Sequence, residues 1–173
     1  MILTIYRSDR TTLAGMERVI GEIWEAPENI YCEEFGVLAT TEAIIQGFNM
    51  VNNAFCPSGS VLFHLFEITS SILDDRQMML VLAHQLAEYL SNRFQVITVV
   101  KQCGNIYKVI VLLNAVSYQD GKKFHDNNNS YINIVALIEK ITGRECRINA
   151  CTGGLFDRNR DNTDCYISYR KEC

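Results

Sequence analysis

The sequence predicts one α+β domain with a mainly antiparallel sheet and helices packed on it. Its length of 173 residues suits a single domain. Strand-like and helix-like stretches follow the order βαβαβαββαββ, and two long apolar stretches, 95–101 and 107–117, are separated only by a short turn. No Ser/Gly-rich linker or internal repeat divides the chain, and only two prolines occur in it.

The first half of the chain alternates between short strands and amphipathic helices. Residues 2–6 form the first predicted strand. From Thr12, which can cap a helix as Thr11 can, apolar residues recur at helical spacing as Met16, Val19, Ile20, Ile23 and Trp24. The proline in the stretch 26–29 ends that helix, because the residue before a proline disfavours helical geometry. A strand at 35–41 and a helix at 42–53 are predicted next.

The second half contains the longest elements. Residues 59–70 alternate as a strand, with His64, Phe66 and Ile68 on one face. A long helix follows within 74–94, capped by Asp74 or Asp75, and its predicted core residues are Met78, Leu82, Leu86 and Leu90. Residues 95–101 and 107–117 then form a hairpin with Gly104 in the turn. The last predicted helix, 131–142, ends at Gly143.

The C-terminal region is predicted to be a strand pair on the same domain. Residues 1–143 form the core, and 144–173 add strands at 146–151 and 165–170 around a hydrophilic loop, 157–164. That loop lacks the glycine and the terminal glutamate of a calcium-binding EF-hand. The spacing of Cys146, Cys151, Cys165 and Cys173 lacks the two tight pairs of a zinc ribbon, so no metal or cofactor is expected.

Net charge and hydropathy limit the class of partner. The formal net charge is −4, whereas a protein that covers nucleic acid broadly carries a basic excess. We therefore expect either a small basic patch or a protein partner. No stretch approaches the roughly 20 apolar residues of a membrane span, and 1–10 does not read as a signal peptide. The predicted location is the cytoplasm of a bacterial host, without membrane contact.

Several motifs resemble the plasmid mobilisation relaxases of the MobA/MobL kind, which are histidine–hydrophobe–histidine endonucleases. The stretches "FHLFEITSS" (63–71), "FQVITVV" (94–100) and "IVLLNAVSYQDGKKFHDNN" (110–128) carry the resemblance, and "IGEIWEAPEN" (20–29) is similar to an N-terminal motif of that family. The resemblance covers about 20–140 and is most specific at 114–124. It implies a fold in which three histidines hold a divalent metal and a tyrosine attacks a DNA phosphodiester.

The chain departs from that family at the residues that carry the chemistry. Aligned on Asn114–Ser117, the place of the family's H-I-H-N-H is taken by I-Y-K-V-I at 106–110, and Lys101 lies near another expected histidine. No histidine occurs between His84 and His125. A lysine does not replace a metal-binding imidazole, because its ammonium group repels the cation. The sequence thus predicts a relaxase-like protein without catalysis, that is, a pseudoenzyme.

The family's tyrosine nucleophile also has no counterpart here. Its place is taken by Ile23 or, with a shift of one, by Glu22 or Trp24. Tyr6, Tyr31 and Tyr107 are the alternative nucleophiles, but a tyrosine with a pKa near 10 needs an activator, and the sequence offers none.

Two groups of basic side chains remain as candidates for binding nucleic acid or a partner. Lys101 and Lys108 lie near the family's metal site and can contact phosphate as point charges, or they form an ordinary exposed pair at the sheet edge. Lys122, Lys123 and His125 can contact phosphate, or they belong to a solvated turn.

Two further histidines need an interpretation. His64 lies on the strand that carries a histidine in the family, so it is a binding candidate, with a satisfied core histidine as the alternative. His84 is expected on the polar face of the long helix, in contact with Glu88 at the i,i+4 spacing.

Three functions fit these observations. The first is a protein of a mobile genetic element, plasmid or phage, that binds and inhibits a nuclease complex, as an anti-CRISPR or anti-restriction protein would. The second is a single-stranded DNA-binding accessory protein in plasmid mobilisation or replication. The third is a metal-dependent DNA nickase with a site rebuilt around His64, His125 and a tyrosine.

Overall fold

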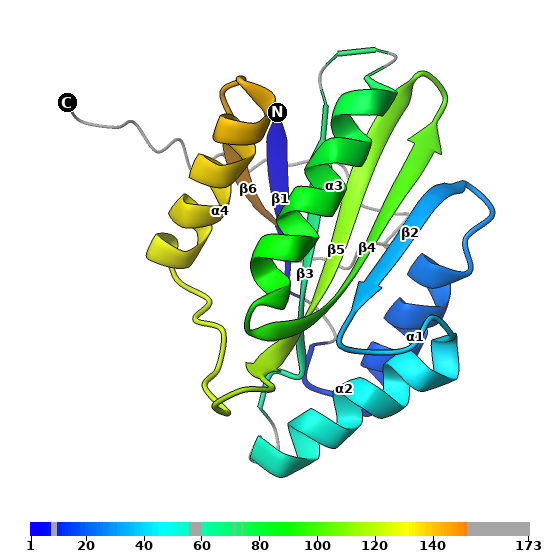
Figure 1. Cartoon of the computed structure of the whole chain (residues 1–173), viewed down its shortest axis with the longest axis vertical. Helices are drawn as coiled ribbons and strands as arrows, with labels where there is room; N and C mark the ends of the chain where they lie inside the picture. Colours follow the sequence, from blue (N-terminus) through cyan, green and yellow to red (C-terminus); the bar gives the residue numbers. More distant parts are fainter. Residues whose placement is uncertain (8–9, 56–59, 71, 74, 152–173) are drawn as a thin grey trace.

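The computed structural model describes residues 1–7, 10–55, 60–70, 72–73 and 75–151. These residues contain six strands and four helices (Figure 1). In chain order they are β1 (Ile2–Tyr6), α1 (Leu13–Trp24), β2 (Asn29–Phe35), α2 (Thr41–Phe55), β3 (Phe63–Thr69), α3 (Arg76–Ser91), β4 (Phe94–Cys103), β5 (Ile106–Ser117), α4 (Asn128–Thr142) and β6 (Arg147–Cys151).

The six strands form one sheet in the order β2-β4-β5-β3-β1-β6. All neighbours pair antiparallel except β1 and β6, which are parallel. The predicted α+β class with a mainly antiparallel sheet is therefore confirmed. The predicted hairpin is also confirmed, with β4 and β5 joined through Gly104 at φ 62°, a left-handed conformation that glycine adopts without steric cost.

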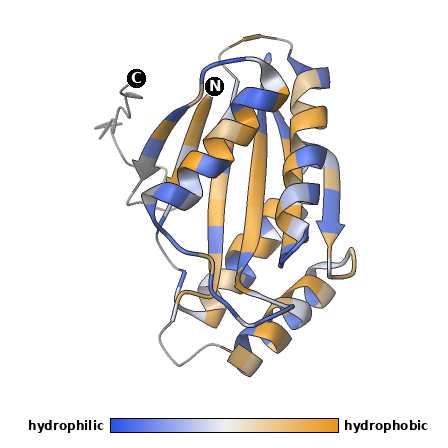
Figure 2. Ribbon diagram, turned by 60° about the vertical axis from the view of Figure 1, so that its left-hand side comes forward, coloured by the Kyte–Doolittle hydropathy of each residue, from blue (hydrophilic) through white to orange (hydrophobic). Residues whose placement is uncertain are grey.

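Helices cover both faces of this sheet. The pair α3 and α4 packs on one face, and α1 and α2 pack on the other (Figure 1). The alternation along β3 follows this arrangement, since Phe66 and Ile68 join the core under α3 and α4 while Phe63 and Leu65 join the core under α1 and α2. Apolar residues run along the central strands between the two helical layers (Figure 2).

Short polar side chains close several helix ends. The hydroxyl of Thr12 accepts a hydrogen bond from the Gly15 amide at 3.1 Å, which caps α1 as predicted. At the other end of α1, the Asn29 side-chain amide donates to the carbonyls of Ile23 and Trp24 at 2.9 and 3.0 Å. Gly143 ends α4 in the left-handed conformation, at φ 66°, also as predicted.

Three local predictions were wrong. The strand predicted at 35–41 ends at Phe35, because Gly36 adopts φ 75° and turns the chain toward α2, so the strand is 29–35 instead. Asp75 occupies the N-cap position of α3 but makes no capping bond, since its carboxylate binds Ser70 and Arg144. Met79, rather than Met78, is the buried methionine of that helix.

The first of the two predicted C-terminal strands is present in the structure. Residues 147–151 form β6, which extends the sheet beside β1, so this segment belongs to the same domain as the core. The second predicted strand, 165–170, and the loop at 157–164 lie outside the described residues.

Candidate functional site

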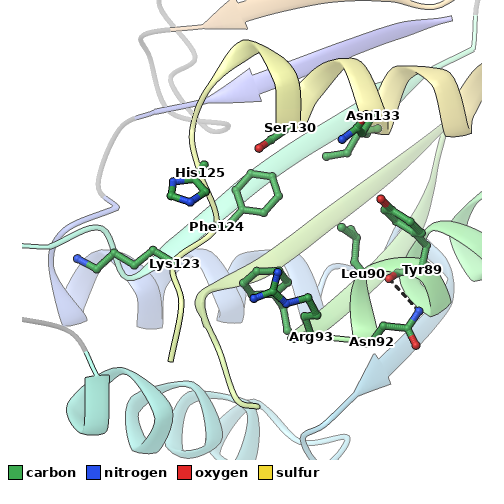
Figure 3. A pocket seen from close by; sticks show the side chains of 11 residues that line it. Tyr89, Leu90, Asn92, Arg93, Lys123, Phe124, His125, Ser130 and Asn133 are labelled. Carbon is green, nitrogen blue, oxygen red and sulfur yellow. Dashed lines mark hydrogen bonds between the residues drawn. The ribbon is translucent and has the colours of Figure 1, made fainter. Parts of the chain in front are cut away.

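A pocket of about 300 Å³ opens between the C-terminal end of α3 and the N-terminal end of α4 (Figure 3). We call it the α3–α4 pocket. The segment that connects β5 to α4 forms one of its walls, and the first turns of α4 form another. Its lining residues are Tyr89, Leu90, Asn92, Arg93, Phe94, Lys123, Phe124, His125, Ser130, Asn133 and Ile134.

The polar lining of the α3–α4 pocket is basic or neutral. Arg93, Lys123 and His125 contribute the basic groups, and no aspartate or glutamate lines the pocket. The Arg93 guanidinium donates to both oxygens of Asp120, at 3.0 and 2.9 Å, and the Lys123 ammonium donates to the Ser60 hydroxyl at 2.9 Å. No carboxylate lines the pocket itself, but Asp120 beside it offsets the positive charge of Arg93, so Lys123 is the main cation that the lining offers an anionic ligand.

Phe124 joins the pocket to the interior of the domain. Its amide donates to the Ala115 carbonyl at 2.8 Å, which holds the connecting segment against the end of β5. Its ring centroid lies 5.8 Å from that of Phe94, 4.9 Å from that of His64 and 6.2 Å from that of Tyr131. Aromatic contacts therefore fix the position of Phe124 while it still lines the pocket.

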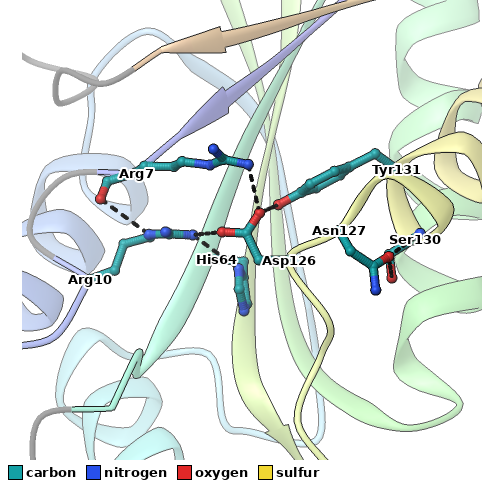
Figure 4. Close-up of polar contacts among 7 residues, drawn as sticks. All are labelled: Arg7, Arg10, His64, Asp126, Asn127, Ser130 and Tyr131. Atoms are coloured by element: carbon teal, nitrogen blue, oxygen red, sulfur yellow. Dashed lines mark hydrogen bonds and ion pairs between the residues drawn. The ribbon is translucent and has the colours of Figure 1, made fainter.

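A polar cluster lies beyond Phe124 (Figure 4). We call it the Asp126 cluster, and its members are Arg7, Arg10, His64, Asp126 and Tyr131. Asp126 is its centre: one carboxylate oxygen accepts from Arg7 at 2.9 Å and from the Tyr131 hydroxyl at 2.5 Å, and the other accepts from Arg10 at 3.0 Å. Arg10 also lies 3.3 Å from the Nδ1 atom of His64.

The environment shifts the pKa values of His64, Asp126 and Tyr131 in the Asp126 cluster. Burial, with the positive charge of Arg10 beside it, lowers the pKa of His64 to about 3, so the imidazole is neutral near pH 7. Burial and the Asp126 carboxylate raise the pKa of Tyr131. Burial opposes ionisation of Asp126, but hydrogen bonds from Tyr131 and Arg10 outweigh it and hold the pKa of Asp126 below its usual value.

The structure brings together only some of the predicted binding residues. Lys123 and His125 line the α3–α4 pocket, whereas Lys122 is exposed and lies 3.5 Å from Asp120. Lys101 and Lys108 are direct cross-strand partners near the β4–β5 turn. Ser117 lies nine positions after Lys108 along β5, which is about 30 Å of strand. The lysines therefore form two separate groups rather than one surface.

The structure shows where the strand lysines, His64 and His84 lie. Lys101 and Lys108 lie on interior strands of the sheet, not at its edge, and the Lys108 ammonium pairs with Glu67 at 3.0 Å. His64 is a buried histidine, with 2% of its surface exposed. Glu88 was expected to be the main partner of His84, and this was wrong. The His84 ring pairs with Glu33 of β2 at 2.8 Å, and this bond raises the pKa of His84.

The alternative nucleophiles do not converge on the pocket. Tyr31 lies on β2, and burial together with Glu33 raises its pKa to about 12, which disfavours the nucleophilic phenolate. Tyr107 is 7% exposed in the core under α3 and α4. Tyr6 belongs to β1 and is half-buried. None of the three lines the α3–α4 pocket.

Sequence reasoning missed the residues that surround Asp126. Arg7, Arg10 and Tyr131 belong to no recognised sequence motif, and Arg10 and Asp126 are 116 positions apart in the chain. Arg93 was missed as well. The only available signal was the stretch "GKKFHD", which was recognised for its lysines and histidine but not for its aspartate.

Within the part of the chain that the structure describes, no group of three or more His, Cys, Asp or Glu side chains is arranged to hold a metal ion. Cys146 is buried there as a free thiol, and Cys165 and Cys173 lie outside the described residues. None of the described helices combines the length and the apolar character that crossing a membrane requires.

Comparisons with protein-family models, with curated proteins and with solved structures found no match to this chain. The relaxase resemblance therefore remains an interpretation of the sequence motifs.

Proposed function

We propose that this chain is a non-catalytic, relaxase-like protein that binds single-stranded nucleic acid in the α3–α4 pocket. The observation that carries the proposal is the lining of this pocket: three basic side chains, several aromatic rings and no carboxylate, in a protein whose net charge is −4. A small basic patch is one of the two ways in which an acidic protein was expected to meet its partner, and this lining supports it.

The chemistry of the lining suits a nucleotide with its phosphate. Arg93 and Lys123 offer charged donors to phosphate oxygens, and His125 offers a ring nitrogen. Tyr89 and Phe124 offer aromatic surface to a base, and each stacked base contributes about 1–3 kcal/mol to single-strand binding. A volume near 300 Å³ is at the small end of ligand pockets, so it suits one nucleotide of a single strand and not a duplex.

The relaxase resemblance extends this proposal to a biological setting. A mobile genetic element, plasmid or phage, that keeps the scaffold without the metal-binding histidines would supply an accessory protein for mobilisation or replication in the bacterial cytoplasm. In this proposal strand binding is retained and phosphodiester cleavage is lost.

The proposal is tested by fluorescence anisotropy with a labelled single-stranded oligonucleotide over a salt series. We expect Lys123→Gln to weaken binding about tenfold, the order of a charge-assisted hydrogen bond. The log–log salt slope should become less steep by about 0.7 for each phosphate that the variant no longer binds. Lys101→Gln, which changes a lysine distant from the pocket, is the matched control. Salt-insensitive binding, or equal weakening by both variants, would refute the proposal.

A second candidate function rests on the segregation of charge. Residues 17–42 carry seven glutamates and a single arginine, so the remainder of the chain has a small positive excess. Five of these glutamates, Glu17, Glu22, Glu25, Glu28 and Glu42, are exposed. An acidic surface of this kind suits the positively charged nucleic-acid channel of a nuclease, as expected for an anti-CRISPR or anti-restriction inhibitor.

A supercoiled-plasmid assay separates the second candidate from the first and from an enzyme. Protection of the plasmid from a guide-loaded CRISPR nuclease, lost in a variant with Glu17, Glu28 and Glu42 changed to glutamine, would support the inhibitor. Nicking by the protein alone with magnesium or manganese would instead support the rebuilt nickase. If neither occurs, the accessory function is the one that remains.

A further inference from the structure

We propose that Arg7, Arg10 and Tyr131 form a phosphate-binding site in which the carboxylate of Asp126 occupies the position of the phosphate. This site is separate from the α3–α4 pocket, and it stands whether or not that pocket binds nucleic acid. The ligand class is a phosphoryl group, either free phosphate or the terminal phosphate of a larger molecule.

Three donors converge on Asp126 from two parts of the chain. Arg7 and Arg10 lie between β1 and α1, and Tyr131 lies on α4 (Figure 4). Their nitrogen and hydroxyl donors lie 2.9, 3.0 and 2.5 Å from the carboxylate oxygens. Two guanidinium groups and a hydroxyl around one oxyanion are also the donors that recognise phosphate. A terminal phosphoryl group offers them three oxygens and a free phosphate offers four, whereas a carboxylate offers two.

Arg10 is held in place by groups other than Asp126. Its Nε donates to the Arg7 carbonyl at 3.2 Å, and its NH1 group lies 3.3 Å from the Nδ1 atom of the buried His64. A neutral His64 that carries its proton on Nε2 can accept from Arg10 at Nδ1. Loss of Asp126 therefore leaves the Arg10 guanidinium in the same position, ready for another anion.

The charge of the cluster favours a more highly charged anion than a carboxylate. Among the described residues, the two arginines face a single carboxylate, so one positive charge is not neutralised. The Arg10 side chain is only 10% exposed, and burial of an excess positive charge is unfavourable. A phosphate dianion in place of the carboxylate would neutralise both arginines.

A ligand can reach this site from solvent. The side chains of Arg7 and Asp126 are 44% and 24% exposed, so the outer side of the cluster faces water. Asp126 belongs to the connection between β5 and α4 rather than to a strand or a helix, so its carboxylate can move aside without breaking the sheet.

Asp75 offers an internal comparison. Its carboxylate pairs with Arg144 and accepts from the Ser70 hydroxyl, so one carboxylate faces one arginine. That pair is balanced in charge, because a single guanidinium, that of Arg144, faces the Asp75 carboxylate. Asp75→Asn is therefore the matched control for a change that only releases an arginine from an ion pair.

The test uses Asp126→Asn in the full chain, with inorganic phosphate as the probe and binding followed by NMR of the arginine side chains. We expect Asp126→Asn to bind phosphate at least tenfold more tightly than the unaltered protein. Asp75→Asn and the double variant Asp126→Asn/Arg10→Gln should show no gain. No gain in Asp126→Asn, or an equal gain in Asp75→Asn, would overturn the proposal and leave Asp126 as a structural ion pair.

Two further arms complete the test. If Asp126→Asn does not fold, the unaltered protein is titrated with phosphate: shifts of the Arg7 and Arg10 side-chain signals support the site, and unchanged signals at millimolar phosphate refute it. A comparison of oligonucleotides with 5′-phosphate and 5′-hydroxyl ends distinguishes the sources. Preference for the phosphorylated end indicates a terminal phosphate, whereas binding of inorganic phosphate alone indicates a free ion. Lys123→Gln reports the α3–α4 pocket separately, so each proposal can fail without the other.

Discussion

Asn114 allows the sharpest test of how the sheet is joined to α2. It is fully buried on β5, and its side-chain amide donates to the Gln95 side-chain oxygen at 2.7 Å and to the Phe48 carbonyl at 3.2 Å. Gln95 in turn donates to the Gly36 carbonyl at 3.0 Å. These bonds connect β5, β4, the turn after β2 and α2.

Asn114→Leu removes both donated bonds and leaves the Gln95 oxygen buried without a donor. Each missing bond costs about 0.5–1.5 kcal/mol, and a buried unsatisfied acceptor costs about 1–3 kcal/mol. We therefore expect the free energy of unfolding to fall by about 2–6 kcal/mol. At roughly 2–4 °C per kcal/mol for a chain of this size, the melting temperature should fall by about 4–24 °C.

The measurement is urea unfolding followed by circular dichroism, together with a thermal scan. Asn53→Leu, at an exposed position of α2, is the control and should change stability by less than about 0.5 kcal/mol. In the double variant Gln95→Leu/Asn114→Leu the orphaned oxygen is absent, so the combined loss should be smaller than the sum of the single losses. A loss below about 0.5 kcal/mol in Asn114→Leu, or strict additivity, would refute this account of the network.

Two other predictions concern a turn and a thiol. Gly121→Ala should destabilise the fold clearly more than Gly104→Ala in the same urea assay: both glycines have positive φ, 67° and 62°, but only at Gly121 would the added Cβ meet the Phe55 ring, at 2.5 Å. Equal losses in the two variants would contradict the clash. Cys146 should react with a maleimide at pH 8 much more slowly than the exposed Cys103, because Cys146 is buried and its pKa is raised to about 11. Peptide mapping of the labelled protein measures both rates, and equal labelling would show that β6 opens readily.

The predictions that held are those that depend on neighbours in the chain. The strand alternation around His64, the turn at Gly104 and the end of α4 at Gly143 follow from side-chain period and from the φ values that glycine accepts. These properties belong to a few consecutive residues, so they can be read from the sequence without knowledge of the sheet order.

The candidate site was predictable only in part for the same reason. Lys123 and His125 were found because they are close together in the sequence, and they do line one pocket. The sequence did not show how Lys101 and Lys108 lie relative to Lys123 and His125, and the length of β5 separates the two pairs. The presence of lysines in a motif does not indicate which end of a strand those lysines lie near.

By itself, the sequence determined the α+β class, the β4–β5 hairpin and most of the helices. Only the tertiary structure decided that Arg7, Arg10 and Tyr131 meet on Asp126, and that β6 lies parallel to β1. The physical reason is that contacts between distant residues depend on the order of strands in the sheet. That order follows from how all the apolar faces are buried together, which no local pattern records.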